Sequence, residues 1–247
     1  MNLRQEKILR SIVEEYTLTA TPIGSKILVE KYKIDASPAT IRNEMAYLEK
    51  KGFLHQPHIS AGRMPTDKGY RYFVEKLMNN KSLSSWEQKK MQKELLRLKA
   101  EKNRLIKTTA KLLSGLSGNL AVSGNLDRSE FVDFGMKELF EEPEFQELDE
   151  VCRLAEVLDY VDEMFDKISK ELKSEETKIF IGKENPVKKI SNCSMIVSPY
   201  HLKSGERGIL ALIGPKRMKY AKNKSLLEYI KKVLGGVGVI ILIIVNF

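Results

Sequence analysis

The sequence of 247 residues predicts an α+β protein whose N-terminal part is mostly helical and whose C-terminal part mixes helices with strands. Three observations support this fold class. Apolar residues recur at helical spacing over residues 1–78, the chain turns polar from Asn79 to Ser85, and short apolar runs typical of strands follow Lys178. We expect three parts: residues 1–78, a basic linker helix over 79–113, and residues 114–247.

The first part has the element order of a winged helix-turn-helix. Thr21-Pro22 and Ser37-Pro38 each place a hydroxyl cap before a proline, which signals the start of a helix. Gly52 ends the third helix, and Pro57 limits the strand before it to an edge. The predicted elements are helices over 2–18, 21–32 and 37–51, extended segments over 53–56 and 63–65, and a fourth helix capped by Thr66.

The remaining residues predict a linker and a second α+β domain. Residues 86–113 are expected to form one long basic helix, and its apolar stripe is a candidate dimerisation surface. Ser114 to Asn125 is rich in Gly, Ser and Asn and predicts a loop. Residues 136–173 are acidic and helical, with a break near Pro143. The apolar stripe of the linker helix consists of Met91, Leu95, Leu98, Leu105 and Leu112. Strands are expected over 178–181, 194–198 and 208–213, and the last two flank a hairpin over Gly205.

Charge is unevenly distributed along the chain. The net charge is +9, but residues 79–111 carry +7, residues 112–177 carry −12 and residues 178–247 carry +10. Such segregation fits a chain that meets a polyanion and keeps an acidic segment away from it.

Few residues favour an enzyme or a cofactor site. The three histidines, His55, His58 and His201, stand in no recognisable catalytic triad spacing, and the two cysteines form no metal-ligand pattern. We therefore expect no catalytic residue, no metal and no cofactor. An acidic helical face is more typical of a solvated surface than of a metal site; it consists of Asp159, Asp162, Glu163 and Asp166.

The N-terminus, the length of the apolar stretches and the two cysteines together indicate a cytoplasmic protein that does not enter a membrane. The N-terminus lacks the apolar core of a secretory signal. The longest apolar stretch, Val237 to Val245, is far shorter than the ~18 residues of a membrane span. Cys152 and Cys193 are expected to be buried free thiols in a reducing compartment.

The third helix has the residue pattern of a helix that reads DNA in the major groove. Ile41, Met45 and Leu48 form its inner face, which leaves small, polar and basic residues outside. The hairpin that follows is also basic and could lie along a phosphate backbone, with Arg63 as a phosphate contact. The alternative is a solvated face. The candidate DNA-binding residues are Ser37, Ala39, Thr40, Arg42, Asn43 and Tyr47 on the helix, and His58, Arg63 and Lys68 in the wing.

The third helix and the hairpin after it resemble a known protein family. The stretch SPATIRNEMAYLEKKGFLHQPHISAGRMPTDKGYRYFV, from Ser37 to Val74, resembles the DNA-binding head of the heat-inducible transcription repressor family, HrcA. The resemblance implies repression of chaperone operons through an inverted-repeat operator on double-stranded DNA, bound by a homodimer. It also implies that a GroEL-type chaperonin supports the active repressor.

Motifs in the last part also resemble this family and imply a GAF-like domain with an inserted dimerisation segment. They are Pro143-Glu144-Phe145, Ile181 to Asn185 (IGKEN) and Gly214 to Tyr220 (GPKRMKY). The chain is shorter than the family usually is, and the missing stretch is expected near Ser123 to Phe134, which predicts a truncated domain. The basic GPKRMKY run is either a plain turn or the lip of a ligand pocket. An alternative function is therefore a winged-helix regulator of other genes that responds to a small ligand or nucleotide.

Overall fold

The computed structural model describes residues 1–79, 83–97, 102–159, 161, 164–165, 167–168 and 176–235. They form two compact units, Met1–Asn79 with Lys216–Lys219 and Asn80–Pro215 with Tyr220–Phe247. Helices and a sheet occur together, which confirms the α+β class. Among the described residues, no helix has the length and apolarity to cross a membrane. The apolar stretch at 237–245 lies outside them.

The first unit is built on three helices whose apolar faces form its core. Ile8 and Ile12 of α1, Leu28 of α2, and Ile41 and Leu48 of α3 are all fully buried. Helix α3 begins as predicted, because the Ser37 hydroxyl accepts the Thr40 N–H and Pro38 occupies the first turn. The helices are α1 (Leu3–Thr19), α2 (Ser25–Glu30), α3 (Pro38–Lys50) and α4 (Asp67–Tyr72), the last continued by the π-helical turn η1 (Phe73–Leu77).

The predicted start of the second helix at Thr21-Pro22 is wrong. Helix α2 begins at Ser25, with Gly24 as its N-cap. Ile23 is extended instead, because its N–H and C=O both bond to the backbone of Arg63, at 2.9 Å each. A contact forty residues away in the sequence therefore overrides the local start signal.

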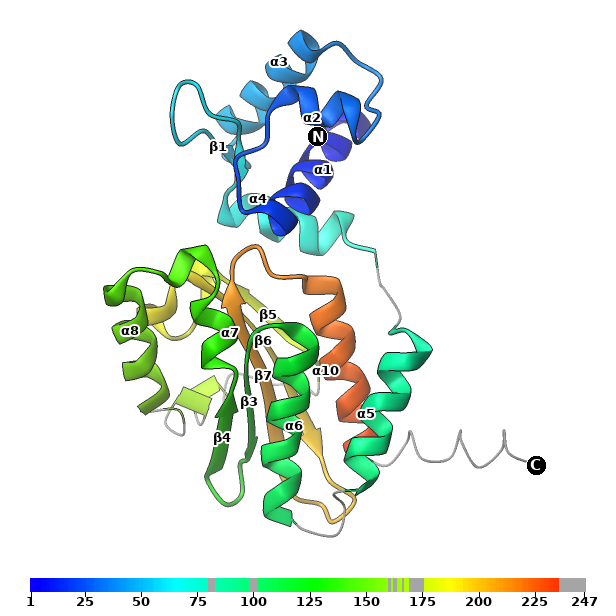
Figure 1. The fold of residues 1–247 in the computed structure, drawn as a ribbon, viewed down its shortest axis with the longest axis vertical. Coiled ribbons are helices and arrows are strands. Elements are labelled where there is room, and N and C mark those ends of the chain that lie inside the picture. Colours follow the sequence, from blue (N-terminus) through cyan, green and yellow to red (C-terminus); the bar gives the residue numbers. More distant parts are fainter. Residues whose placement is uncertain are drawn as a thin grey trace, which may run out of the picture. The chain divides into compact units, whose positions relative to one another are not determined.

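A short hairpin follows α3, as the sequence predicts. Strand β1 (Leu54–His55) pairs antiparallel with β2 (Met64–Pro65), and Figure 1 shows the loop between them extending away from the helices of this unit. Thr66 then caps α4 through its hydroxyl, which accepts the Gly69 N–H at 3.1 Å. The observed order of helices and hairpin matches the predicted order.

The second unit contains a five-stranded antiparallel sheet in the order β4-β3-β7-β6-β5. Its long central hairpin turns at Gly205, which has a φ of 86° and so favours glycine. The strands are β3 (Leu120–Asn125), β4 (Glu130–Phe134), β5 (Lys178–Ile181), β6 (Cys193–His201) and β7 (Arg207–Pro215).

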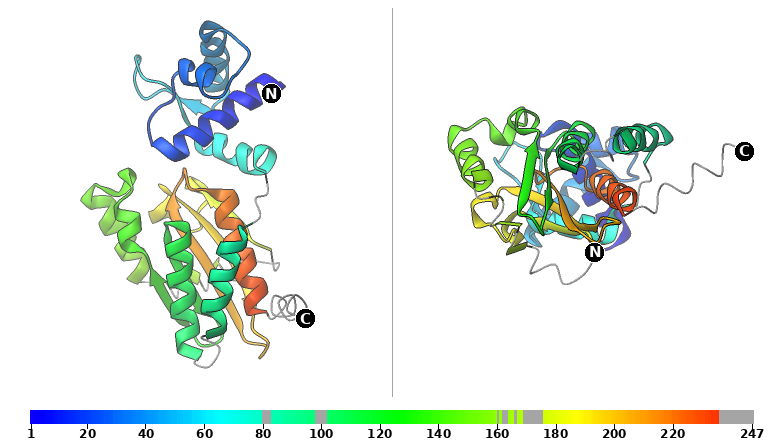
Figure 2. Two further views of the ribbon diagram at one scale, coloured as in Figure 1. Left: turned by 45° about the vertical axis from the view of Figure 1, so that its right-hand side comes forward. Right: turned by 90° about the horizontal axis from the view of Figure 1, so that it is seen from below.

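Helices cover both faces of this sheet (Figure 2). Helices α6 and α10 pack on one face, and α5 packs on both of these helices. The other face carries the main apolar core, which includes Leu139 of α7 and Phe145 of η2. The helical elements are α5 (Ser85–Arg97), α6 (Lys102–Ser117), α7 (Met136–Phe140), α8 (Leu148–Asp159), α10 (Tyr220–Leu234) and the 3-10 turns η2 (Pro143–Phe145), η3 (Gly182–Glu184) and η4 (Lys188–Ile190).

Two predictions for the second unit are wrong. The single helix expected over 86–113 is two helices, α5 and α6, which pack on each other. Residues 120–125 form the buried strand β3 instead of a loop, and β4 follows it, so both strands exist where residues were expected to be missing. Strand β3 tolerates its Gly, Ser and Asn because it is paired on both sides, with β4 and β7.

Helices α5 and α6 bury part of the expected dimerisation stripe. Met91 is fully buried within this one chain, whereas Leu105 and Leu112 are half-buried. Apolar side chains already buried in their own unit are not available to a partner. Leu98 of the stripe lies outside the described residues.

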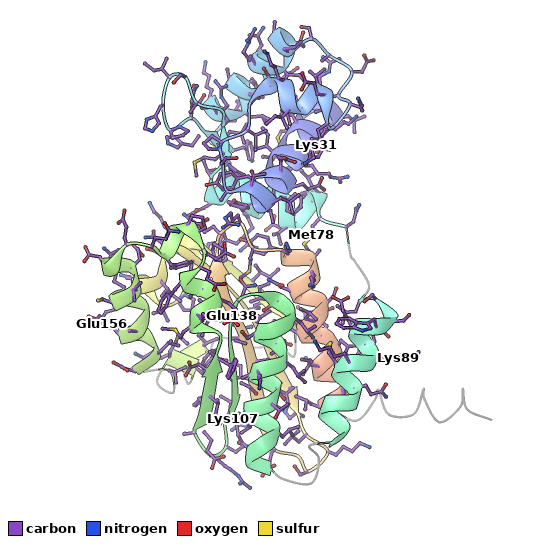
Figure 3. The ribbon with its side chains drawn as sticks, in the orientation of Figure 1. Lys31, Met78, Lys89, Lys107, Glu138 and Glu156 are labelled. Atoms are coloured by element: carbon purple, nitrogen blue, oxygen red, sulfur yellow. The ribbon has the colours of Figure 1, made fainter. Side chains whose placement is uncertain are left out.

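The cysteine prediction holds for one thiol only. Both cysteines are free and Cys193 is buried, but Cys152 is exposed on α8. The surface of α8 also carries Glu156, labelled in Figure 3, which pairs with Lys189. This ion pair holds the pKa of Glu156 below its usual range.

Glu15 is a buried carboxylate that ties α1 to the end of α2. It lies 2.6 Å from the Lys31 ammonium and accepts a hydrogen bond from the Tyr32 hydroxyl at 2.9 Å. Lys31 is labelled in Figure 3. The hydrogen bond from Lys31 is the main cause that lowers the pKa of Glu15, and it outweighs the effect of burial.

Replacing this carboxylate should destabilise the first unit in a pH-dependent way. The carboxylate contributes stability that is fully present above its unfolded pKa, near 4.5, and is lost as the pH falls through the lower folded pKa. We therefore expect Glu15→Gln to unfold at lower urea concentration than the wild type at pH 7. The gap between the two proteins should close as the pH falls below about 4. Glu14→Gln, at an exposed neighbour, is the control, and a gap that does not change with pH would contradict this account.

Candidate functional site

The exposed face of α3 carries a row of polar and basic side chains. Ala39, Arg42, Asn43 and Tyr47 are exposed, whereas the opposite face is buried in the core. Within the described part of the chain, no hydrogen bond or ion pair holds Arg42 or Asn43. Both side chains are therefore available to a ligand without breaking an internal contact.

Ser37 and Thr40 have a local role at the start of this helix. Their hydroxyl oxygens lie 2.9 Å apart, and the Ser37 oxygen also accepts the Thr40 N–H at 3.1 Å. They form the N-cap of α3, a type of helix end that attracts anions. Both residues remain next to Ala39 at the end of the helix that carries Arg42 and Asn43.

The two acidic residues of α3 are held by partners in the same unit. Glu44 accepts a hydrogen bond from Gln5 at 2.9 Å. Glu49 pairs with Arg63 at 2.9 Å. Because both carboxylates are occupied, the exposed face of α3 presents Arg42 and Lys50 to an approaching anion with little opposing charge.

Glu49 also joins α3 to the hairpin. Its Oε1 accepts the Gln56 N–H at 3.0 Å, where the chain enters the loop between β1 and β2. Its Oε2 accepts from the Arg63 Nε at 2.9 Å, where the chain leaves the loop. One carboxylate therefore holds both ends of the loop against the end of α3.

Gln56 organises the loop itself. Its side-chain amide donates to the carbonyl oxygens of Ile59 and Ala61, at 2.9 and 2.8 Å. The sequence reasoning missed the roles of Glu49 and Gln56. A usable signal was present for Gln56 alone, since the turn-rich run from Pro57 to Gly62 leaves carbonyl groups that need a side-chain donor.

The three predicted wing residues lie in different surroundings. His58 is exposed in the loop. The Lys68 ammonium lies 4.6 Å from the centre of the Phe53 ring and donates to the Lys51 carbonyl at 2.9 Å, so it satisfies the C-terminal end of α3. Only 14 % of the Arg63 side chain is exposed, and its pairing with Glu49 gives it a structural role. The proposed phosphate contact by Arg63 stays a prediction.

The family motifs in the second unit hold the sheet together. The buried Asn185 amide donates to three carbonyl groups, those of Gly182, Ile190 and Cys193, at 2.8–3.1 Å. Tyr220 is buried and its hydroxyl lies 2.7 Å from that of Ser194. Of the two alternatives for the GPKRMKY run, the buried Tyr220 contradicts the open lip, because it anchors α10 to β6.

The second unit also has an open groove of ≈ 780 Å³ beside α10. It is lined by lysines of α10, by His201 and by two glutamates. Across the described ranges, no three His, Cys, Asp or Glu side chains come together as a metal site would require. Of the predicted acidic face, Asp162, Glu163 and Asp166 lie outside those ranges. The lining residues are Glu176, Thr177, His201, Leu202, Lys224, Glu228, Lys231, Lys232 and Gly235.

Comparison with known proteins identifies the family. A family model described as the HrcA protein C-terminal domain matches residues 68–223. The heat-inducible transcription repressor HrcA of Natranaerobius thermophilus is 29 % identical over 321 residues, which cover 90 % of this chain and 92 % of the relative. That of Pelotomaculum thermopropionicum is 28 % identical, with 95 % and 96 % covered. Both alignments are longer than this chain, so these relatives contain stretches that it lacks.

A solved structure supports the fold. The crystal structure of a hypothetical protein matches with a TM-score of 0.77 and 21 % identity, and the match covers 96 % of this chain and 98 % of that chain. At this identity the match speaks for the fold alone. The family model spans well over half of the sequence, and the chain therefore belongs to the HrcA family.

Proposed function

We propose that this protein is a DNA-binding repressor of heat-shock genes that acts in the cytoplasm and uses residues 1–78 as a winged helix-turn-helix. Its curated relatives are heat-inducible transcription repressors. The observation that carries the proposal is the exposed face of α3, where no hydrogen bond or ion pair holds Arg42 or Asn43 and both acidic residues have partners in the same unit.

The chemistry of this face suits the major groove of DNA. The groove is about 12 Å wide and admits an α-helix end-on or along its length. Arg42 can donate two hydrogen bonds to guanine, and Asn43 can pair with adenine. Ser37 and Thr40, at the N-terminal end of α3, suit phosphate or base edges, and Tyr47 can contact the backbone further along. We assign no catalytic step to this surface.

We further propose that two copies act together on an inverted-repeat operator. A symmetric operator requires a two-fold protein whose reading helices lie about one helical turn, ~34 Å, apart. Of the predicted apolar stripe, Met91 is buried within the chain, whereas Leu105 and Leu112 are half-buried and remain candidate contacts for the homodimer. The family resemblance also implies support by a GroEL-type chaperonin, which a crosslink between the two proteins would test.

The direct test is selection of DNA by the full chain. Duplexes with a randomised centre would be incubated with the protein, recovered and sequenced over several rounds. We expect an inverted repeat to be enriched, and light scattering should give two protein copies on the selected duplex. Absence of any enrichment would contradict the proposal.

The groove beside α10 is the candidate site for the alternative function, a regulator of other genes that responds to a small ligand or nucleotide. Three lysines and His201 line it against two glutamates, a composition that suits a small anion such as a nucleotide. A regulator of other genes that responds to such a ligand would melt at a higher temperature with ATP or GTP present. The same nucleotides should then change the affinity for the selected duplex.

The first prediction for this function concerns the outer face of α3. Arg42→Ala and Asn43→Ala should each weaken binding to the selected duplex by about 1–3 kcal/mol, and less on a random duplex, if they contact bases. Fluorescence anisotropy at fixed salt would measure this. Lys76→Ala removes one exposed positive charge elsewhere in the unit and is the matched control. Equal losses on both duplexes would show that the two residues touch only phosphate.

The second prediction separates the two roles of Arg63. Loss of its bond to Glu49 should lower the free energy of unfolding by about 1–2 kcal/mol in Arg63→Met, because a partly buried carboxylate loses a charged donor. Urea denaturation would measure this, and Arg63→Lys should recover part of the loss. An unchanged stability, with a salt dependence of DNA binding flatter by about one log–log unit, would instead make Arg63 a phosphate contact.

A further inference from the structure

The tip of the loop between β1 and β2 presents an isoleucine to solvent. The exposed fraction of Ile59 is 101 %, the highest among the exposed large hydrophobic residues of the described chain. The run from Gln56 to Gly62 contains neither lysine nor arginine, and His58 is its one ionisable residue. A loop tip of this composition is poorly suited to bind phosphates, which are usually contacted by Lys and Arg.

The loop is built so that Ile59 takes no part in holding it. The Gln56 amide donates hydrogen bonds to the carbonyl oxygens of Ile59 and Ala61, and the Ala61 N–H donates to the His58 carbonyl at 2.9 Å. The base of the loop is equally tight, because a Cβ at Gly62 would lie 2.4 Å from the carbonyl carbon of Ile23. The backbone around the isoleucine is therefore fixed by polar contacts, while its side chain contacts nothing.

Single exposed apolar residues are common and need no explanation by themselves. Ile59 differs because a preorganised loop displays it, and preorganisation lowers the entropy cost of binding. The loop is also tied through Glu49 to α3, the helix for which we propose a place in the major groove. The two elements would therefore approach DNA as one body.

We propose that Ile59 is an apolar wedge that the wing presses into the minor groove of the bound duplex. This inference rests on the proposed function. With α3 in the major groove, the next groove along the duplex is about 6 Å wide, which admits a side chain but no helix. Apolar side chains in this groove contact sugars and base edges and can partly unstack a base step. The 2-amino group of guanine stands in the minor groove, so the wedge favours A·T pairs beneath the wing.

A wedge and a phosphate contact differ in their response to salt. Removing a phosphate contact changes the slope of log K against log salt, whereas removing an apolar contact leaves that slope unchanged. We expect Ile59→Ala to bind the selected duplex ~5–20-fold more weakly at every salt concentration, as partial burial of an isoleucine side chain would give. Its melting temperature should match that of the wild type, since the side chain supports nothing in the fold.

The experiment uses the full chain and the duplex selected by it, with and without 2,6-diaminopurine in place of adenine beneath the wing. This base adds an amino group to the minor groove and leaves the major-groove edge intact. The wild type should lose affinity for the modified duplex, and Ile59→Ala should lose less. Leu3→Ala removes another exposed apolar side chain, on α1, and should behave as the wild type on both duplexes.

Two results would overturn the inference. Ile59→Ala could change the salt slope, or it could bind DNA as tightly as the wild type, with or without losing a protein partner in a pull-down. Loss of a protein partner with normal DNA binding would make Ile59 a protein contact. If the wild type selected no duplex at all, the proposed function itself would fail. If it selected one that Ile59→Ala bound equally well, only the wedge would fail.

Discussion

The structure of the first unit depends on the carboxylate of Glu49. A hairpin with two residues in each strand is too short to be stable alone. Here one side chain at the end of α3 accepts the Gln56 N–H with one oxygen and the Arg63 guanidinium with the other. Arg63 in turn is paired through its backbone with Ile23, before α2. The helix, the hairpin and the segment between α1 and α2 are thereby fixed to one another.

Through this arrangement, α3 and the loop between β1 and β2 have different roles. Pairing with Arg63 compensates the charge of Glu49, while the exposed face of α3 shows Arg42 and Asn43. The loop is held at both ends by Glu49, through the Gln56 N–H and the Arg63 guanidinium. In the second unit, by contrast, the motif residues Asn185 and Tyr220 satisfy buried backbone and side-chain groups, and they hold the sheet and α10 in place.

Local patterns predicted the elements that are stabilised locally. The Ser37 and Thr66 caps are confirmed, because each hydroxyl accepts a backbone N–H three residues along the chain. The buried face of Ile41, Met45 and Leu48 is also confirmed, because helical spacing alone places these residues on one side. The errors arose where distant contacts decide. Ile23 is extended because Arg63 pairs with it, and residues 120–125 form a strand because β4 and β7 flank them. The contacts of Glu49 with Gln56 and Arg63 could not be predicted from residue spacing, because these two partners lie at opposite ends of a loop.

The central claim is that the ion pair between Glu49 and Arg63 joins α3 to the hairpin, and a double-mutant cycle tests it most directly. The free energy of unfolding would be measured for the wild type, Glu49→Gln, Arg63→Met and the double variant of the full chain. If the two side chains form the joint, removing the second after the first should cost little, which gives a coupling energy of at least about 1 kcal/mol. Strictly additive losses, with a coupling energy near zero, would contradict the account.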